Sequence, residues 1–134
     1  MAAKLDHLIV QAADKVVSAK FLTDILGLTG AEPSGPFLAV TVANGVTMDF
    51  FEPGHDFLPQ HYAFSVDDER FEAVLVNIGT MHLLYWADPF HREPNVVANF
   101  NGERHVYFND PSGHNLEVLT NEMNAGGLPS AAAS

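Results

Sequence analysis

The sequence predicts an α+β domain in which one structural unit is used twice. In each unit, a strand that carries a histidine leads into a helix, and the last of the following strands carries a carboxylate. Two stretches share the order of apolar strand, turn with glycine, and apolar strand with an acidic residue. Gly45 lies four positions before Asp49, and Gly113 lies four positions before Glu117. Because a repeated pattern indicates a repeated supersecondary unit, the two halves are expected to be related.

Each half begins with a similar strand that contains one histidine. Residues 5–10 carry His7, and residues 61–66 carry His61. The distance from this histidine to the carboxylate is 42 positions in the first half and 56 in the second. The surplus predicts a longer loop in the second half, around residues 87–103.

The first half has a signal for each expected element. A strand is expected at residues 4–11, where alternation places His7 on one face of the sheet with its apolar neighbours two positions away. Asp14 predicts the N-cap of a helix, and Gly27 predicts its end. Residues 30–36, rich in glycine and proline, predict a loop.

A hairpin is expected to complete the first half. Asn44-Gly45 lies between two apolar stretches, at residues 37–42 and 46–52. Asn-Gly between such stretches is the strongest short-range hairpin signal, because both residues tolerate the positive φ of a tight turn.

The second half repeats this order with a longer connection. Residues 67–69 place three acidic side chains where a helix begins, which the helix dipole favours. This helix is expected to end at Gly79. Three strands are expected after it, at residues 81–86, 104–109 and 114–120.

The composition limits the classes of protein. The chain has 134 residues, 47% of them hydrophobic, and no cysteine. That length suits one domain with a sizeable core. The absence of cysteine excludes disulfides, thiolate metal sites and a cysteine nucleophile.

No apolar run approaches the ~20 residues of a membrane span. The first strand begins too early for a signal peptide, so a cytoplasmic protein is expected.

The charge balance is strongly acidic. Six Lys and Arg residues stand against 17 Asp and Glu residues, a formal net charge of −11. Nucleic acid is not an expected partner, because its binding requires a basic surface. The charge favours metal ions and cationic small molecules, although solubility alone is the simpler interpretation.

Glu117 lies inside the apolar run at residues 116–119, directly after a turn. A carboxylate in a buried strand is costly unless it is paired or bound to a cation. We interpret Glu117 as a metal ligand. A buried ion pair is the alternative.

These stretches resemble the vicinal-oxygen-chelate superfamily, which includes glyoxalase I, fosfomycin-resistance proteins, extradiol dioxygenases and bleomycin-resistance proteins. The resemblance extends over residues 4–120 and is carried by residues 5–10 (LDHLIV), 21–28 (FLTDILGL), 61–66 (HYAFSV) and 106–119. It implies two βαβββ modules that form a curved, cup-shaped mixed sheet with the helices outside. It does not identify the reaction, because this fold hosts many activities.

The resemblance also sets the expected boundaries. Residues 1–121 are expected to form a single domain, with module one at about 4–56 and module two at about 60–120. Residues 122–134 are expected to form a flexible C-terminal tail.

In the metal-dependent members, a histidine from the first strand of each module and a glutamate from the last strand of the second module bind the metal. The residues at those positions here are His7, His61 and Glu117. Two imidazoles and one carboxylate suit a divalent metal with open positions, such as Fe(II), Mn, Ni or Zn. The alternative for each histidine is a satisfied core residue.

Asp49 occupies the position of the acidic fourth ligand of glyoxalase I, but aspartate is one methylene shorter than glutamate. We expect Asp49 to be a catalytic residue, for which three roles are open. It could bind the metal, hold a metal-bound water or a histidine through a hydrogen bond, or act as a general base.

The long loop at residues 87–103 is a further candidate. Phe90, His91 and Arg92 could reach over a bound ligand, and the last two could hold an anionic substrate. Solvated loop charge is the alternative. His114 lies beside a turn and is expected to be exposed, without a role.

The first hypothesis is a metal-dependent enzyme for a small substrate that chelates the metal through adjacent oxygens. Its reaction could be that of a glyoxalase-like lyase or isomerase, or that of a ring-cleaving dioxygenase. The second hypothesis is a non-catalytic resistance protein that sequesters a cationic aromatic compound. A homodimer is expected in either case, because exposed sheet edges need cover.

Overall fold

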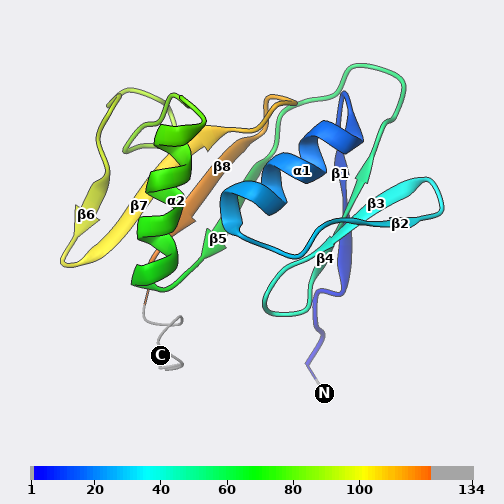
Figure 1. The fold of residues 1–134 in the computed structure, drawn as a ribbon, viewed down its shortest axis with the longest axis horizontal. Coiled ribbons are helices and arrows are strands. Elements are labelled where there is room, and N and C mark those ends of the chain that lie inside the picture. The colour runs from blue at the N-terminus through cyan, green and yellow to red at the C-terminus, as the bar shows by residue number, and fades with distance from the viewer. Residues whose placement is uncertain (1, 122–134) are drawn as a thin grey trace. The chain divides into compact units, whose positions relative to one another are not determined.

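A computed structural model describes residues 2–121 of the chain and divides them into two compact units. The first unit holds residues 2–59 and 110–112, and the second holds residues 60–109 and 113–121. Each unit contains one helix and one four-stranded sheet (Figure 1). The expected α+β class with two related modules is therefore confirmed.

The first unit has the order βαβββ. Its elements are β1 (His7–Gln11), α1 (Lys15–Leu26), β2 (Glu32–Ser34), β3 (Phe37–Thr41) and β4 (Thr47–Phe51). The strands lie in the order β1-β4-β3-β2. β1 is parallel to β4, whereas β3 is antiparallel to both β4 and β2. Helix α1 carries the chain from β1 to β2 at the opposite edge of the sheet, and the antiparallel run β2-β3-β4 then brings β4 beside β1 and parallel to it.

Helix α1 begins and ends at the predicted residues. The carboxylate of Asp14 accepts hydrogen bonds from the backbone N–H groups of Val16 and Val17 at 3.0 and 3.1 Å. Gly27 ends the helix in the left-handed conformation, with φ of 69°. α1 packs on β3 and β4, and its buried residues include Leu22 and Ile25.

The two faces of the first sheet differ in what they carry. Val10, Val40 and Phe50 are almost completely buried and share the face that α1 covers. Because side chains alternate along a strand, His7 and Asp49 lie on the opposite face. The predicted hairpin leads to β4, with Gly45 at φ of 88°. Asn44 does not share this positive φ, and the N–H of Gly45 donates to the C=O of Val42, so the turn differs from the expected two-residue Asn-Gly type.

The second unit repeats this order. Its elements are β5 (His61–Ser65), α2 (Asp68–Thr80), β6 (Ala98–Phe100), β7 (Glu103–Asn109) and β8 (Asn115–Leu119). The strands lie in the order β5-β8-β7-β6, again with one parallel pair, β5 and β8. β7 is antiparallel to β8 and to β6.

Arg104 fastens α2 to one face of this second sheet. Its guanidinium pairs with the carboxylates of Glu72 and Asp68 on α2 and lies 4.4 Å from the ring centroid of Phe71. Val106 lies on the same face of β7 as Arg104 and is fully buried. In the described part of the chain, neither helix is long and apolar enough to cross a membrane.

Three sequence predictions for the elements of the second unit were wrong. Residues 81–86 form no strand, because the chain turns after α2, with His82 at φ of 55°, and only Trp86 forms bridges, to Pro94 and Tyr107. The fourth strand of the second sheet is instead β6, inside the expected loop. α2 ends at Thr80 rather than Gly79.

Two further expectations concern the loop at residues 30–36 and the C-terminal residues. β2 lies inside the stretch expected to be a loop, where it pairs with β3 over three residues. The expected C-terminal tail at residues 122–134 lies outside the described residues.

Candidate metal centre

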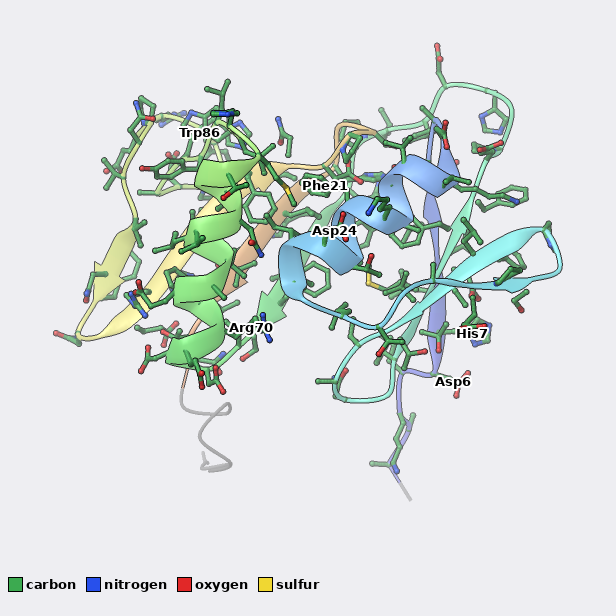
Figure 2. The ribbon with its side chains drawn as sticks, viewed as in Figure 1. Asp6, His7, Phe21, Asp24, Arg70 and Trp86 are labelled. Atoms are coloured by element: carbon green, nitrogen blue, oxygen red, sulfur yellow. The ribbon has the colours of Figure 1, made fainter. Side chains whose placement is uncertain are left out.

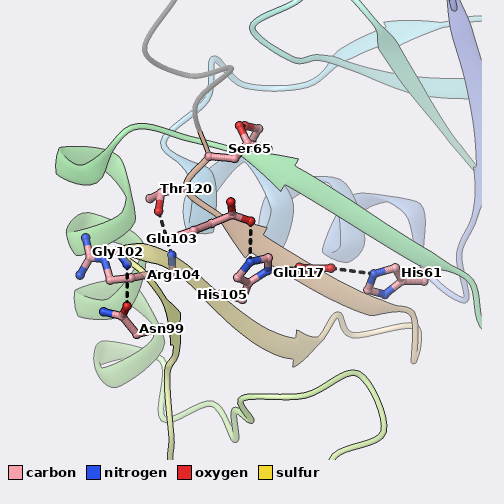
Figure 3. Close-up of polar contacts among 10 residues, drawn as sticks. His61, Ser65, Asn99, Gly102, Glu103, Arg104, His105, Glu117 and Thr120 are labelled. Carbon is pink, nitrogen blue, oxygen red and sulfur yellow. Dashed lines mark hydrogen bonds and ion pairs between the residues drawn. The ribbon is translucent and has the colours of Figure 1, made fainter. Parts of the chain in front are cut away.

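The open face of the second sheet carries a row of polar side chains. Glu117 on β8 is opposite Tyr107 on β7 and Ala63 on β5. By alternation, His61 and His105 share this face with Glu117, whereas Arg104 and α2 lie on the other. The antiparallel and parallel pairings of β8 thus gather these side chains around one carboxylate (Figure 3).

Glu117 and His61 are in contact. Oε1 of Glu117 lies 3.0 Å from Nε2 of His61. The side chain of Glu117 is 11% exposed, whereas that of His61 is 43% exposed. The pair therefore joins a buried carboxylate to an imidazole that solvent and small molecules can reach.

The second oxygen of Glu117 is held by a residue that sequence reasoning missed. Nδ1 of His105 lies 2.6 Å from Oε2 of Glu117, and Nε2 lies 2.9 Å from Oε2 of Glu103 (Figure 3). His105 is two positions from Tyr107 on the same strand. Because side chains alternate between the two faces along a strand, its place on the open face could be predicted from the sequence. Its contact with Glu117 runs diagonally across β7 and β8, because its direct partner is Leu119.

Tyr107 completes the surroundings of Glu117. Burial, together with the charge of Glu117 and a hydrogen bond to it, raises the pKa of Tyr107 to about 12. The ring of Tyr107 stacks with that of His61, with centroids 6.0 Å apart. Its phenol therefore stays protonated at neutral pH and acts as a hydrogen-bond donor.

The first unit places His7 and Asp49 on neighbouring strands. Nδ1 of His7 donates to Oδ2 of Asp6 at 2.7 Å (Figure 2). This hydrogen bond, the charge of Asp6 and, to a lesser extent, the charge of Asp49 raise the pKa of His7. Asp6 was not predicted to have a role, although its position next to His7 is a signal for one. A carboxylate on Nδ1 leaves Nε2 of His7 to bind a ligand, as in many metal sites.

The strand registers match between the two units. His7 pairs with Thr47, two positions before Asp49. His61 pairs with Asn115, two positions before Glu117. The predicted repeat therefore holds at the level of individual residue pairs.

The donor atoms of the second unit fit a divalent ion. Metal–nitrogen and metal–oxygen bonds of ~2.0–2.2 Å place two ligand atoms about 3 Å apart when they meet at roughly a right angle, and Nε2 of His61 lies 3.0 Å from Oε1 of Glu117. Within residues 2–121, no three His, Asp or Glu side chains form a group that could hold a metal. His7 belongs to the first unit, so the set of His7, His61 and Glu117 stays a prediction.

The loop before β6 is fixed near the start of β8. His91 stacks on Trp86 with ring centroids 3.7 Å apart, and its Nε2 lies 3.3 Å from Oδ1 of Asn115. Arg92 lies over the ring of Phe90, which is 74% exposed. Both side chains that were considered for an anionic substrate, His91 and Arg92, thus have an aromatic neighbour.

His114 is buried, with 1% of its surface exposed, which corrects the expectation of an exposed residue. Its Nδ1 accepts a hydrogen bond from the backbone N–H of Gln60 at 2.9 Å, and its ring meets the edge of Tyr62. The turn before β8 is therefore folded inward, and His114 fixes the residue that precedes His61.

Comparisons with known proteins identify the family. No family model matches the chain, and no curated protein sequence matches it. The solved structure of oxidase ChaP-H1 is 46% identical, with a TM-score of 0.88 over 94% of this chain and 100% of that chain. A glyoxalase/dioxygenase from Nostoc punctiforme has a TM-score of 0.67 and 22% identity over 88% of this chain and 90% of that chain. The chain belongs to the vicinal-oxygen-chelate superfamily.

A second member of the superfamily supports the same assignment. Oxidase ChaP-H2 is also 46% identical, with a TM-score of 0.87 over 95% of this chain and 100% of that chain. The resemblance seen in the sequence is thereby confirmed, and so is the fold of the superfamily. The metal and the reaction of this chain are separate questions.

Proposed function

We propose that the chain is a metal-dependent enzyme whose substrate is a small molecule that binds the metal through two adjacent oxygens. One observation carries the proposal: a buried carboxylate, Glu117, lies 3.0 Å from the accessible imidazole of His61 on the open face of a sheet. His105 holds the other oxygen of this carboxylate, and the imidazole of His61 with Oε1 of Glu117 forms a pair of donor atoms of the kind that divalent metals bind. His7 is the proposed third ligand.

Each residue has a definite task in this proposal. His61 and Glu117 hold the ion together with His7, and Asp6 orients His7 through Nδ1. Tyr107 donates a hydrogen bond to Glu117 and, with a pKa of about 12, carries no charge near the ion at neutral pH. When bound, a divalent ion with open positions supplies Lewis acidity to the oxygens of a chelating substrate.

The comparisons favour an oxidative reaction. The two relatives at 46% identity are named oxidases, and two imidazoles with one carboxylate form the ligand set of many Fe(II) oxygenases. We therefore rank a dioxygenase, with Fe(II) as the metal and dioxygen as the oxidant, above a glyoxalase-like lyase or isomerase.

A resistance protein that sequesters a cationic aromatic compound is the second candidate. The net charge of −11 favours it, because an acidic protein attracts cations. Metal content separates the two candidates. Elemental analysis of protein purified without an affinity tag should find a transition metal, and protein that neither contains nor takes up a metal would support sequestration.

We also propose that the protein is a cytoplasmic homodimer. β1 and β2 are the outer strands of the first sheet, and β5 and β6 are those of the second. Outer strands leave backbone groups that a second chain can cover. Light scattering at micromolar concentration should give the mass of two chains, and the mass of one chain would contradict this part of the proposal.

A substrate screen tests the reaction. Protein reconstituted with Fe(II), Mn, Ni or Zn is offered catechols and 2-oxoaldehyde–thiol adducts in parallel. We expect turnover of catechol-type substrates with Fe(II), accompanied by oxygen uptake. Turnover of the thiol adducts without oxygen uptake would instead support the lyase.

A further inference from the structure

We propose that His105 is a positioning residue that fixes the carboxylate of Glu117, so that only Oε1 is presented beside His61. This inference rests on the proposed function, because it concerns the residue that holds a proposed metal ligand. No role for His105 follows from the ligand set itself.

The ring of His105 is held at both of its nitrogens. Nδ1 donates to Oε2 of Glu117 at 2.6 Å, and Nε2 lies 2.9 Å from Oε2 of Glu103. The ring of Phe100 on β6 meets the ring of His105 edge-on at 5.6 Å. The side chain of His105 is 14% exposed, so water competes little for these contacts.

The two oxygens of Glu117 consequently have different partners. Oε2 is bound to His105, whereas Oε1 faces Nε2 of His61. The terminal torsion of a glutamate is broad and roughly two-fold, so a carboxylate without such contacts rotates readily. The contact with His105 therefore selects one orientation and favours a bond through Oε1 alone.

Residues that hold a metal ligand affect affinity without touching the metal. Their loss costs roughly 10–100-fold in metal affinity. Glu103 is further from the proposed metal, because it contacts His105 rather than Glu117. Its side chain is 42% exposed. We expect its removal to have a smaller effect than removal of the His105 ring nitrogens.

The test compares two variants of His105. His105→Phe keeps a ring of similar shape without hydrogen-bonding nitrogens, and His105→Asn keeps a donor near the position of Nδ1. Affinities for Zn and Co(II) are measured by competition with a chromophoric chelator, and the visible spectrum of the Co(II) form is recorded. These measurements need no substrate and no turnover.

We expect His105→Phe to lower the affinity for both ions by about 10–100-fold and to change the Co(II) spectrum. His105→Asn should recover most of the affinity, and Glu103→Ala should show a smaller loss than His105→Phe. His55→Phe is the matched control, because His55 is an exposed histidine in the first unit. It should bind both ions as the wild type does.

Three results overturn the inference in different ways. If the wild type binds ions and His105→Phe binds them equally well with the same Co(II) spectrum, His105 does not position Glu117, and the proposed metal site stands. If the wild type binds neither ion, the proposed function fails together with the inference.

If His105→Phe does not fold, the affinities of His105→Asn and Glu103→Ala decide. Wild-type affinity in Glu103→Ala together with a full loss of affinity in His105→Asn contradicts the inference.

Discussion

Oε1 of Glu117 on β8 lies 3.0 Å from Nε2 of His61 on β5. The contact joins the last strand of the second module to its first strand, which are parallel neighbours in the sheet. The same arrangement in the first module places Asp49 on β4 beside His7 on β1. This correspondence makes Asp49 the residue whose role is most informative to test.

Asp49→Asn should lower metal affinity by roughly 10–100-fold, as expected of a residue that supports the site without binding the ion. The reason is that Asp49 shares a sheet face with His7 on the neighbouring strand, where its negative charge would favour a bound cation. A chelator-competition titration at one pH and salt concentration measures the change. Glu32→Gln, which removes one charge from the exposed strand β2, is the control and should have no effect.

A much larger loss in Asp49→Asn would instead make Asp49 a direct ligand, as in glyoxalase I. Affinity and activity equal to those of the wild type would remove Asp49 from the site.

Tyr107 should titrate about two pH units above an ordinary tyrosine, because its pKa is about 12. The folded protein holds this proton more tightly than the unfolded chain does. The contribution of this group to the free energy of unfolding is therefore fully present below pH 10. It is lost as the pH rises from 10 to about 12. Ultraviolet absorbance measures the ionisation of the three tyrosines, and unfolding by urea at several pH values measures the stability.

Tyr107→Phe is the comparison for that measurement. In this variant the last tyrosine transition should disappear, and stability should fall less steeply between pH 10 and 12. Three transitions at ordinary pH in the wild type would contradict the raised pKa of Tyr107.

His114→Phe should destabilise the protein by about 0.5–1.5 kcal/mol, the net contribution of a typical hydrogen bond. The imidazole is buried, and its Nδ1 accepts from the N–H of Gln60. Denaturant unfolding measures the loss. His55→Phe, at an exposed position, should change stability by less than about 0.5 kcal/mol, and equal stability of the two variants would contradict the role given to His114.

Arg104→Ala should cost about 1–2 kcal/mol, because it removes the ion pairs to α2 and the cation–π contact with Phe71. Lys20→Ala is the contrast. It breaks an exposed pair with Asp24 within α1, which is worth only ~0.3–0.5 kcal/mol. Urea unfolding of both variants checks the difference, and a loss in Arg104→Ala no greater than that in Lys20→Ala would show that the contact does not fasten α2.

The repeated unit was predictable because its signals are local. An N-cap at Asp14, the Asn-Gly turn at Gly45 and the alternation along β5 and β8 each fix structure within a few residues. The family resemblance placed Glu117 and His61 together as metal ligands. The register that brings their atoms into contact depends on the pairing of β5 with β8, which are more than fifty positions apart in the sequence.

Other parts depend on contacts that no local pattern encodes. Residues 81–86 have a strand-like composition, but the chain turns at His82 after α2, and β6 forms the outer strand of the sheet instead. The short strand β6 has only three residues and little β propensity. His105 was missed as a site residue because its contact with Glu117 is diagonal, and His114 because its turn is folded inward.

The central claim is that His7, His61 and Glu117 together bind one divalent ion. The most direct test is a count of ions per chain after reconstitution and removal of excess metal, for the wild type and for His7→Ala and His61→Ala. We predict one ion per chain in the wild type and none in either variant, with circular dichroism showing that both variants remain folded. A full ion in folded His7→Ala, or none in the wild type, would contradict the claim.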